Sequence, residues 1–445
     1  MERFDVVIVG GGVSGSIAGI AAARNGSRVL IIESMGFLGG SLTNAGVNPM
    51  MTFHAGDRQV ILGITNEIVQ ELVKIGKSPG HVKDPGNFTA TYTPFDPEAM
   101  KYVLEKLLRD AGGKVLFHAQ LQDVVVEHEI IKNISVLTRT GTSVLAASVY
   151  IDATGDAELA TRAGLKTRLG REGDEFTQAM TLTMRMDNVN VEKLRKYVLT
   201  HPDEFWVDSD KFKRAERISV AGFKKEWAAA KAAGEISADN GRDYLLMFEA
   251  NNPGEFVFNS TRISGYNPID PWSLSDAEFV GRRQCLEIER FVKKVVPGFE
   301  NAHVIGTGPN IGIRSSRQIV GLHTITGSEL LHQIVPEDTI AISGYPIDIH
   351  DEKTSNVKKL PYGGFYGIPY RALVGREVAN LIVTGRCISA TFQAQSAIRT
   401  TPTVGAIGEA AGLAASMAAI SSTPVQKIDI QVLRQKLKAN GGFIQ

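Results

Sequence analysis

The sequence contains very little cysteine. Its 445 residues include two cysteines, Cys285 and Cys387, about 100 positions apart, and no C-x-x-C pair. A thioredoxin-type redox centre, an iron–sulfur ligand set and a zinc cluster are therefore not expected. Because so few cysteines are typical of a reducing compartment, we expect a cytoplasmic protein without a bound metal.

An excess of charge of either sign is also missing. Lys and Arg together number 48, as do Asp and Glu, so neither nucleic acid nor an anionic membrane is an expected partner. The stretch from Val6 to Ala23 has no charge, but its glycines and the preceding acids Glu2 and Asp5 argue against a signal or membrane segment. We expect no other stretch to approach a membrane-spanning length.

The most informative segment is the first 33 residues. A predicted strand, Asp5–Val9, leads into a G-x-G-x-x-G turn and an Ala-rich helix, and a second strand follows at Val29–Ile32. In this pattern Gly10 permits the tight turn, Gly12 lets the backbone approach a pyrophosphate, and Gly15 allows close packing of the helix on the sheet. The sequence therefore predicts a dinucleotide site at the helix N-terminus.

Glu33 supplies the other half of this pattern. It ends the second strand, 18 residues after Gly15, where a carboxylate accepts hydrogen bonds from both hydroxyls of an adenosine ribose. A 2′-phosphate would be repelled there. The expected ligand is thus FAD or NAD.

Periodicity divides the rest of the chain into three parts. The N-terminal part continues with expected helices and alternating strands, and the middle part has charged helical stretches and all three tryptophans. The C-terminal part returns to a buried strand, a glycine turn and a helix rich in small residues. The predicted helices are 59–76, 96–111, 192–200, 212–233, 275–296 and 402–419, and the predicted strands are 114–127, 131–153 and 380–384.

Three segments match the places where a two-dinucleotide-type flavoprotein returns to its cofactor: Gly10–Glu33, Ala153–Asp156 and Thr384–Arg386. Further matching strings are Leu38-Gly-Gly-Ser-Leu-Thr43, Gly312-Ile-Arg-Ser-Ser-Arg317, Tyr345-Pro-Ile-Asp-Ile-His350 and Arg399-Thr-Thr-Pro-Thr403. With these strings the chain resembles the FAD-dependent oxidoreductase family over nearly its whole length, most weakly from about 187 to 300.

The resemblance implies an α/β protein with the glutathione reductase-like fold. A Rossmann-like FAD-binding domain, a parallel sheet plus a β-meander, would be built from both chain ends, 1–156 and 376–445. An α+β substrate or cap domain would be inserted between them at 157–375. The cofactor would be non-covalent FAD, since Leu38–Thr43 contains no histidine for a covalent link.

The predicted FAD contacts extend beyond the N-terminal fingerprint. Gly405, Gly408 and Gly412 share one face of the last long helix, where each glycine costs about 1 kcal/mol relative to alanine. Close approach to the flavin and to the first helix would explain them, and helix packing alone is the alternative. The predicted contacts are Gly10, Gly12, Val13, Ser14, Gly15, Glu33, Ser34, Gly39, Gly40, Ser41, Thr43, Leu121, Thr154, Gly155, Asp156, Gly385, Arg386, Thr403, Val404 and Gly405.

Candidate catalytic residues are His350, His54, Arg314 and Arg399. Either histidine could move a proton near neutral pH, and an arginine beside the flavin could clamp a carboxylate at two points. A structural histidine and an inter-domain salt bridge are the alternatives.

Three further expectations concern the surroundings of these candidates. Tyr345, Tyr366 and Tyr370 are expected to form pocket walls, and Cys387 to be a buried apolar residue. Many relatives carry a His-Glu pair where this chain has Phe392 and Gln393. If that pair moves protons in the relatives, this chain must use another group or a different substrate.

The leading hypothesis is an FAD-dependent dehydrogenase or reductase that passes a hydride between a small organic substrate and flavin N5. A non-catalytic electron-transfer or scaffold subunit is a second hypothesis. A flavin hydroxylase is a third, less favoured because such enzymes usually have Gly-Asp where this chain has Gly385-Arg386. The electron acceptor is left open, and so is association into homo-oligomers.

Overall fold

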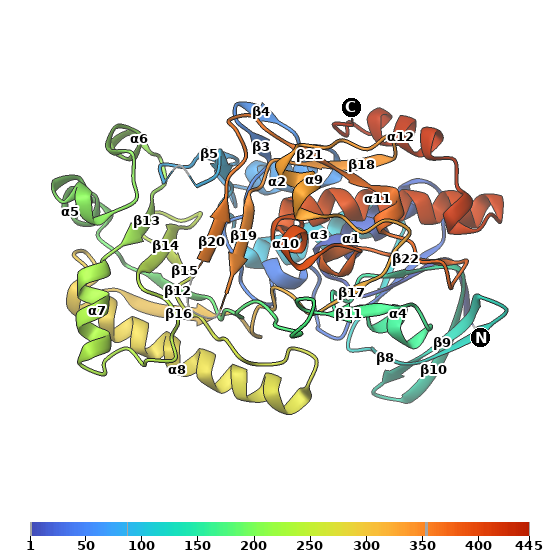
Figure 1. Cartoon of the computed structure of the whole chain (residues 1–445), viewed down its shortest axis with the longest axis horizontal. Coiled ribbons are helices and arrows are strands. Elements are labelled where there is room, and N and C mark those ends of the chain that lie inside the picture. Colours follow the sequence, from blue (N-terminus) through green and yellow to red (C-terminus); the bar gives the residue numbers. More distant parts are fainter. Residues whose placement is uncertain (1, 87, 352–354, 445) are drawn as a thin grey trace.

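The computed structural model describes residues 2–86, 88–351 and 355–444. Figure 1 shows a region around a seven-stranded sheet, which carries both ends of the chain, beside a region around a five-stranded sheet flanked by α5 to α8. The second region comes from the middle of the sequence. The two chain ends therefore build one body together.

The seven-stranded sheet has the order β7-β2-β1-β10-β9-β8, with β22 paired to β10. The strands β7, β2, β1, β10 and β22 run parallel, whereas β8, β9 and β10 form an antiparallel meander. This arrangement confirms the predicted fold class. The bounds are β1 Glu2–Val9, β2 Val29–Ile32, β7 Lys114–Leu116, β8 Gln120–Glu127, β9 Ile130–Thr138, β10 Gly141–Asp152 and β22 Leu381–Val383.

Both faces of β1 are buried, as the unbroken apolar run Val6–Val9 requires of a central parallel strand. Val6 and Ile8 pack with the long helices on one face, and Val7 and Val9 pack with the meander and α4 on the other. The helices of this region are α1 Val13–Arg24, α2 Gly63–Lys74, α3 Pro97–Asp110, α4 Glu158–Arg162, α9 Gly327–Leu331, α10 Phe392–Ile398, α11 Thr401–Ser421 and α12 Ile430–Ala439.

Glycines bring α11 against α1. A Cβ atom on Gly408 would lie 2.4 Å from the carbonyl oxygen of Ser14, and one on Gly412 would lie 2.1 Å from that of Ala18. These two glycines are therefore needed for helix packing. Gly405 instead faces Thr65 of α2, whose Oγ1 would lie 2.6 Å from its Cβ.

The helix α11 is also long and apolar enough to span a membrane by length and composition, with a mean hydropathy of 1.4. The expectation that no stretch beyond the N-terminus approaches such a length was therefore wrong. Within the described residues, 78% of its apolar window is buried inside the protein, as in the core helix of a globular fold.

The second region is built on an antiparallel sheet of order β13-β14-β15-β12-β16. Its core contains Trp227 and Phe291, whose ring centroids lie 5.2 Å apart. The bounds are β12 Met184–Asp187, β13 Ser219–Gly222, β14 Leu245–Glu249, β15 Phe256–Phe258, β16 His303–Thr307, α5 Val191–Thr200, α6 Ser209–Arg214, α7 Lys224–Ala232 and α8 Pro271–Val295.

One predicted helix in this region was wrong. The stretch 212–233 contains the end of α6, the strand β13 and the helix α7 rather than one helix. Ile218 and Val220 are fully buried, and β13 pairs with β14. Sheet pairing in the folded protein thus outweighs the helical tendency of the lysine- and alanine-rich flanks.

Residues 319–374 contribute to the core of the first region, through side chains such as Ile325, Ile342 and Tyr366. The expected domain boundaries at 156 and 375 stay a prediction, and the second apolar core is made by residues 182–302 alone. The short strand pairs are β3 His54–Ala55 with β4 Arg58–Gln59, β5 Val82–Lys83 with β6 Thr91–Tyr92, β11 Thr167–Leu169 with β17 Arg317–Ile319, β18 Thr339–Ser343 with β21 Tyr366–Pro369, and β19 Ile347–His350 with β20 Ser355–Lys358.

Candidate active site

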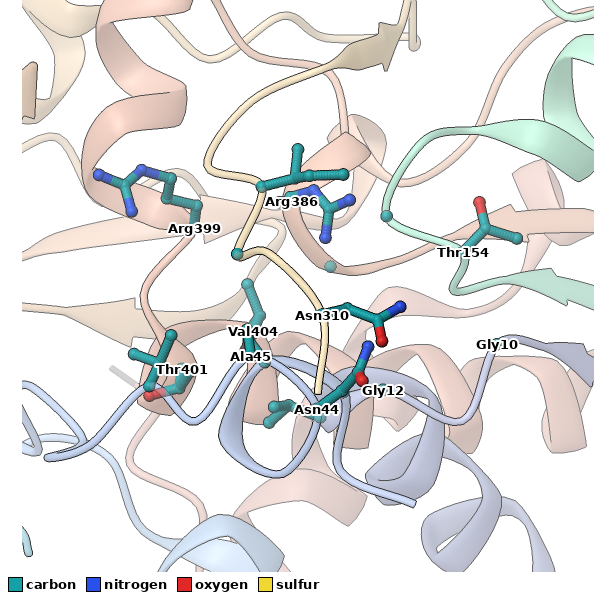
Figure 2. A pocket seen from close by; sticks show the side chains of 18 of the residues that line it. Gly10, Gly12, Asn44, Ala45, Thr154, Asn310, Arg386, Arg399, Thr401 and Val404 are labelled. Atoms are coloured by element: carbon teal, nitrogen blue, oxygen red, sulfur yellow. The ribbon is translucent and has the colours of Figure 1, made fainter. Parts of the chain in front are cut away.

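A cavity of about 710 Å³ is lined by residues of both regions, a volume in the range of small-molecule and cofactor sites. Gly10, Gly12 and Thr154 lie towards one end of the view in Figure 2, and Arg399 and Thr401 lie towards the other. The first end is made by the predicted glycine turn, and the second by residues of β19, the loop before β17 and the junction of α10 with α11. The cavity thus has two chemically different ends.

The glycine turn leaves open space at one position. Gly10 has a φ of +101°, which favours glycine, and a Cβ atom on Gly15 would lie 1.9 Å from the carbonyl oxygen of Gly10. A Cβ atom on Gly12, in contrast, would meet only the Cα of Gly40, at 3.9 Å. Since no side chain caps α1 at Gly12, the first N–H groups of this helix are available to an anion in the cavity.

Glu33 is held at the edge of this end of the cavity. Its Oε2 accepts a hydrogen bond of 2.7 Å from the backbone N–H of Gly11, and its Oε1 accepts one of 2.8 Å from Met35. The Ser34 hydroxyl donates to Oε1 at 3.1 Å. These bonds fix the carboxylate, which still has lone pairs for the hydroxyls of a ribose.

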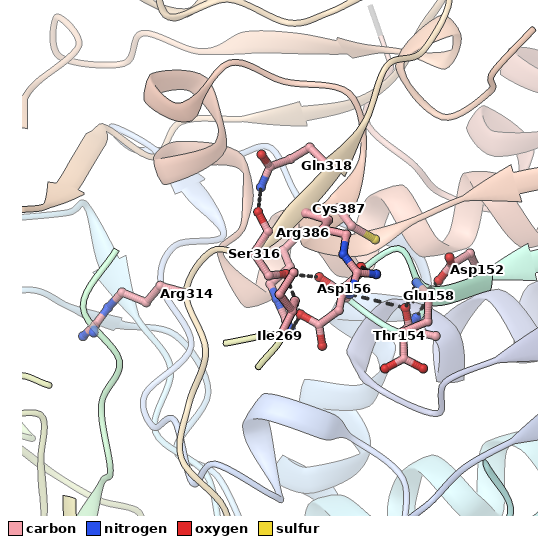
Figure 3. A network of polar contacts seen from close by, with 12 residues as sticks. Asp152, Thr154, Asp156, Glu158, Ile269, Arg314, Ser316, Gln318, Arg386 and Cys387 are labelled. Atoms are coloured by element: carbon pink, nitrogen blue, oxygen red, sulfur yellow. Dashed lines mark hydrogen bonds and ion pairs between the residues drawn. The ribbon is translucent and has the colours of Figure 1, made fainter. Parts of the chain in front are cut away.

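A polar network joins the ends of β10, β17 and β22, as Figure 3 shows. Asp156 Oδ1 accepts a bond of 2.7 Å from Arg386 Nη2 and another from the Ser316 hydroxyl. Gly155 has a φ of +80°, and a Cβ atom there would lie 2.4 Å from Arg386 Nη1. The network therefore holds the Arg386 guanidinium against the Thr154–Gly155 turn, where the Arg386–Asp156 ion pair forms part of the cavity wall.

The other end of the cavity contains a buried histidine–aspartate pair on β19. His350 Nε2 lies 3.0 Å from Asp348 Oδ2, and the Tyr345 hydroxyl donates to the same oxygen at 3.3 Å. Burial lowers the pKa of His350 to about 3, which Asp348 opposes and Arg314 reinforces. Burial alone would raise the pKa of Asp348, but His350, Arg399 and Arg314 hold it below its usual range.

Two arginines face the same end from different elements. Arg399 ends α10, and Arg314 lies between β16 and β17. Arg314 donates to the carbonyl oxygen of Ala179 and, at 3.3 Å, to Asn259 Oδ1. Among the residues that the structure describes, the Arg399 guanidinium makes neither a hydrogen bond nor an ion pair, and its Nε is buried.

The cavity brings together most of the residues that the sequence singled out. Three of the four catalytic candidates line it, and so do fifteen predicted FAD contacts. These residues are His350, Arg314 and Arg399, with Gly10, Gly12, Val13, Ser14, Glu33, Ser34, Gly40, Ser41, Leu121, Thr154, Gly155, Asp156, Gly385, Arg386 and Val404.

Five predicted contacts support the cavity from behind instead of lining it. Gly15, Gly39 and Gly405 allow close backbone or side-chain packing. The Thr43 hydroxyl donates to the carbonyl oxygen of Leu38 at 2.7 Å, and the Thr403 hydroxyl pairs with Ser343 at 2.9 Å. The three glycines thus serve close packing, and the two threonine hydroxyls bond within the protein.

His54 is not among the residues that line the cavity. It begins the short strand β3, where its Nδ1 pairs with the Thr91 hydroxyl at 3.0 Å and its ring lies 5.3 Å from that of His81. Burial lowers the pKa of His54. The expectation that it faces the flavin is therefore not supported by its position.

The expectation of pocket walls fails for two tyrosines. The hydroxyls of Tyr366 and Tyr370 are buried in the core, where they donate to the carbonyl oxygens of Tyr345 and Val425. Tyr345 does line the cavity. Cys387 is fully buried, as expected, and burial raises the pKa of its thiol.

Sequence reasoning missed two groups of lining residues. One is the loop directly after Thr43, which extending the Leu38–Thr43 string would have found. The other comes from the second region, where no motif signals a ligand. These residues are Asn44, Ala45, Val47 and Asn48 in the first group, and Thr181, Thr183, Phe248, Asn259, Glu278 and Asn310 in the second.

The comparison with known families decides the nature of the site. The sequence model described as FAD dependent oxidoreductase matches residues 5–437. The chain belongs to this family. As a member of the FAD-dependent oxidoreductases it is an enzyme that uses FAD, which confirms the resemblance read from the motifs.

Individual relatives are distant. A thiamine thiazole synthase of Aeropyrum pernix is 32% identical over 173 residues, and the match covers 36% of this chain and 57% of that protein. The chain thus matches little more than half the length of this relative.

One solved structure has a fold similar to that of this oxidoreductase over nearly the whole chain. A geranylgeranyl bacteriochlorophyll reductase-like protein from Thermoplasma acidophilum has a TM-score of 0.50 and 15% identity, covering 99% of this chain and 84% of that one. An L-proline dehydrogenase from P. horikoshii has a TM-score of 0.47 and 11% identity, with all of both chains covered. At such identities the likeness to the first protein shows the fold alone.

The residues of the oxidoreductase fit FAD. Gly12 leaves a cradle at the start of α1 that a Cβ atom would begin to fill, and uncapped N–H groups point to an anion there. Glu33 and Arg386 bring the charges that suit a ribose and a pyrophosphate. The glycine turn, Glu33 and Arg386 would therefore hold the nucleotide half of FAD.

Proposed function

We propose that this protein dehydrogenates or reduces a small organic molecule by hydride transfer to or from FAD. Bound FAD supplies a hydride acceptor at N5. The observation that carries the proposal is the cavity with two ends, one built for a dinucleotide and one lined by a buried His–Asp pair and two arginines. A scaffold protein without a substrate would have no need of the second end.

In this proposal His350 exchanges the proton that accompanies hydride transfer. Its low pKa keeps the imidazole neutral at neutral pH, so it is able to accept a proton. Asp348, ionised beside it, orients the ring and stabilises the imidazolium that forms. The pair takes the place of the His-Glu pair of many relatives, since Phe392 and Gln393 do not line this cavity.

The N-terminus of α11 supports the same end of the cavity. Thr400 occupies the N-cap position, but its side chain does not cap the helix, and Pro402 lies in the first turn. Thr400 and Thr401 line the cavity. The positive end of the helix dipole would thus stabilise negative charge that develops on the flavin.

The test begins with the visible spectrum of the purified protein and of the cofactor released by heat. The flavin form is then mixed anaerobically with panels of alcohols, amines and hydroxy acids, and separately with NADH. We expect bleaching of the flavin band by a small metabolite and no rapid reaction with NADH. Rapid reduction by NADH with oxygen consumption would instead indicate a hydroxylase, and reduction by dithionite alone a scaffold.

A variant pair then tests the role of His350. Because a positioned acid or base contributes about 10²–10⁴-fold, His350→Gln is expected to slow flavin reduction at least 100-fold while FAD is retained. His54→Gln is the matched control, a half-buried histidine outside the cavity. Equal rates for the two variants would remove His350 from the reaction.

A further inference from the structure

We propose that the substrate is a small organic carboxylate, bound by Arg314 and Arg399 at the end of the cavity away from Gly12. This inference rests on the proposed function and names the class of molecule on which it acts. The two guanidiniums come from separate elements, the loop between β16 and β17 and the end of α10. Both line the same cavity, and Arg399 lies near enough to Arg314 to lower its pKa, which is already lowered by burial.

The hydrogen-bonding state of Arg399 is the first argument. A guanidinium has five N–H donors, and burying one without partners costs several kcal/mol, of the order of the penalty for an unpaired charged group. Among the described residues, no acceptor is bonded to the Arg399 side chain, and its Nε has no access to solvent. Arg399 therefore lies at the cavity surface with its donors unused.

The second argument is the charge around the two arginines. Burial lowers the pKa of Arg314, and the positive charge of Arg399 lowers it further. Among the described residues, Asp348 is the acid that opposes this effect on both Arg314 and Arg399.

The nearby acids already have partners. Asp348 accepts from His350 and Tyr345, and Glu278 accepts from Arg282 at 3.1 Å and from the backbone N–H of Ile311 at 2.7 Å. Asp348 is thus the acid that Arg314 and Arg399 share, whereas Glu278 pairs with Arg282, so a monoanion suits the two arginines better than a more highly charged group. A carboxylate carries a single negative charge and is bound by a guanidinium at two points.

The third argument is the apolar part of the cavity lining that lies outside the predicted FAD contacts. Phe248, Leu274, Ile313 and Tyr345 line the cavity, and Ile313 directly precedes Arg314. They offer surface for the carbon part of a substrate, while the arginines hold its charged end. A free inorganic anion would leave this apolar surface unused.

FAD itself does not account for the two arginines. Its pyrophosphate belongs to the other end, where Gly12 and Arg386 lie, and Figure 2 shows Arg399 on the side of the cavity away from Gly10 and Thr154. Negative charge on a reduced flavin is the competing role for Arg399, because the N-terminus of α11 lies near it. The experiment must therefore be done on the oxidised holoprotein.

The oxidised, FAD-loaded protein is titrated with benzoate and propionate, with benzamide and propionamide as neutral counterparts, and with inorganic phosphate. The readouts are the visible flavin band and the thermal midpoint. We expect saturable changes with a carboxylate and none with its amide. A hydrogen bond to a charged group is worth about 1.5–3 kcal/mol, so Arg399→Gln and Arg314→Gln should each weaken carboxylate binding about 10–100-fold.

Arg399→Lys keeps the charge and should restore part of the affinity if Arg399→Gln is unstable. Arg376→Gln, at an exposed arginine away from the cavity, is the matched control and should bind like the parent protein. Equal binding of acid and amide, binding of phosphate alone, or carboxylate affinity unchanged in Arg399→Gln would overturn the proposal. A protein that never retains FAD would contradict the proposed function instead, and the thermal midpoint would still test the carboxylate site.

Discussion

Replacing Gly12 by alanine should separate FAD binding from folding. Gly12 has φ −65° and ψ −173°, a conformation open to any residue, and its new Cβ would meet only the Cα of Gly40 at 3.9 Å. The Cβ atom causes no clash, but Gly12 is the N-cap residue of α1, where alanine is less favourable than glycine. The free energy of unfolding of the apoprotein should therefore fall by only about 1 kcal/mol. The methyl group would occupy the space in which the FAD pyrophosphate approaches the helix.

The expected loss of affinity follows from the hydrogen bonds that the methyl group would break. A bond from a backbone N–H to a charged phosphate is worth about 1.5–3 kcal/mol, and each 1.4 kcal/mol is about tenfold in Kd. Displacing the pyrophosphate from even one such N–H at the start of α1 should raise the Kd for FAD on the order of 10–100-fold. Calorimetric titration of the apoprotein with FAD measures this change directly.

Two other glycines provide the controls. In Gly15→Ala the Cβ would lie 1.9 Å from the carbonyl oxygen of Gly10, so this variant should lose stability, by about 1–3 kcal/mol or more. In Gly306→Ala, on β16, the nearest atom is a side-chain nitrogen of Arg185 at 3.8 Å, and neither stability nor FAD affinity should change. Parental FAD affinity in Gly12→Ala, or a large loss of its apoprotein stability, would refute the reasoning.

Glu33→Gln should weaken FAD binding about tenfold, because ribose hydroxyls donate more strongly to a carboxylate than to an amide. Equilibrium dialysis measures it, with Glu127→Gln, at an exposed glutamate outside the cavity, as the matched control. Burial raises the pKa of Glu409 to about 7, above its unfolded value, so this group should destabilise the protein as pH rises from about 4.5 through 7. Glu409→Gln should thus match the parent protein near pH 4 and be more stable at pH 8 by a few kcal/mol, about 1.4 per pH unit of the shift. Urea unfolding at pH 4 and pH 8 checks this. If the variant loses as much stability between these pH values as the parent protein does, Glu409 is not the cause of the loss.

The FAD end of the site could be predicted because its determinants are local in sequence. A strand, a glycine turn, a helix and an acid at fixed spacing occupy about 30 consecutive residues, and each has a steric or electrostatic reason to be there. The structure adds which glycine serves which purpose. Gly12 leaves open space beside the start of α1, whereas Gly15 lies so close to the carbonyl oxygen of Gly10 that a side chain there would clash.

The substrate end could not be predicted in the same way, because its residues meet only in the folded chain. Arg314 and Arg399 are brought together by the packing of the loop after β16 against α10, and His54, which motif position favoured, pairs with Thr91 instead. The single helix predicted at 212–233 was wrong for the same reason, because contacts between distant parts of the chain decide its structure. Pairing of β13 with β14 is a non-local interaction that helical periodicity does not report.

The charge at the substrate end links the two proposals. Burial holds the pKa of His350 at about 3, and Arg314 contributes to lowering it. A proton acceptor works best when its pKa lies near the working pH. A carboxylate bound to Arg314 and Arg399 would offset their positive charge and shift the pKa of His350 upwards, so that the histidine becomes a better base when the substrate is in place. A neutral substrate would leave that charge uncompensated, which is a further reason to expect an acid.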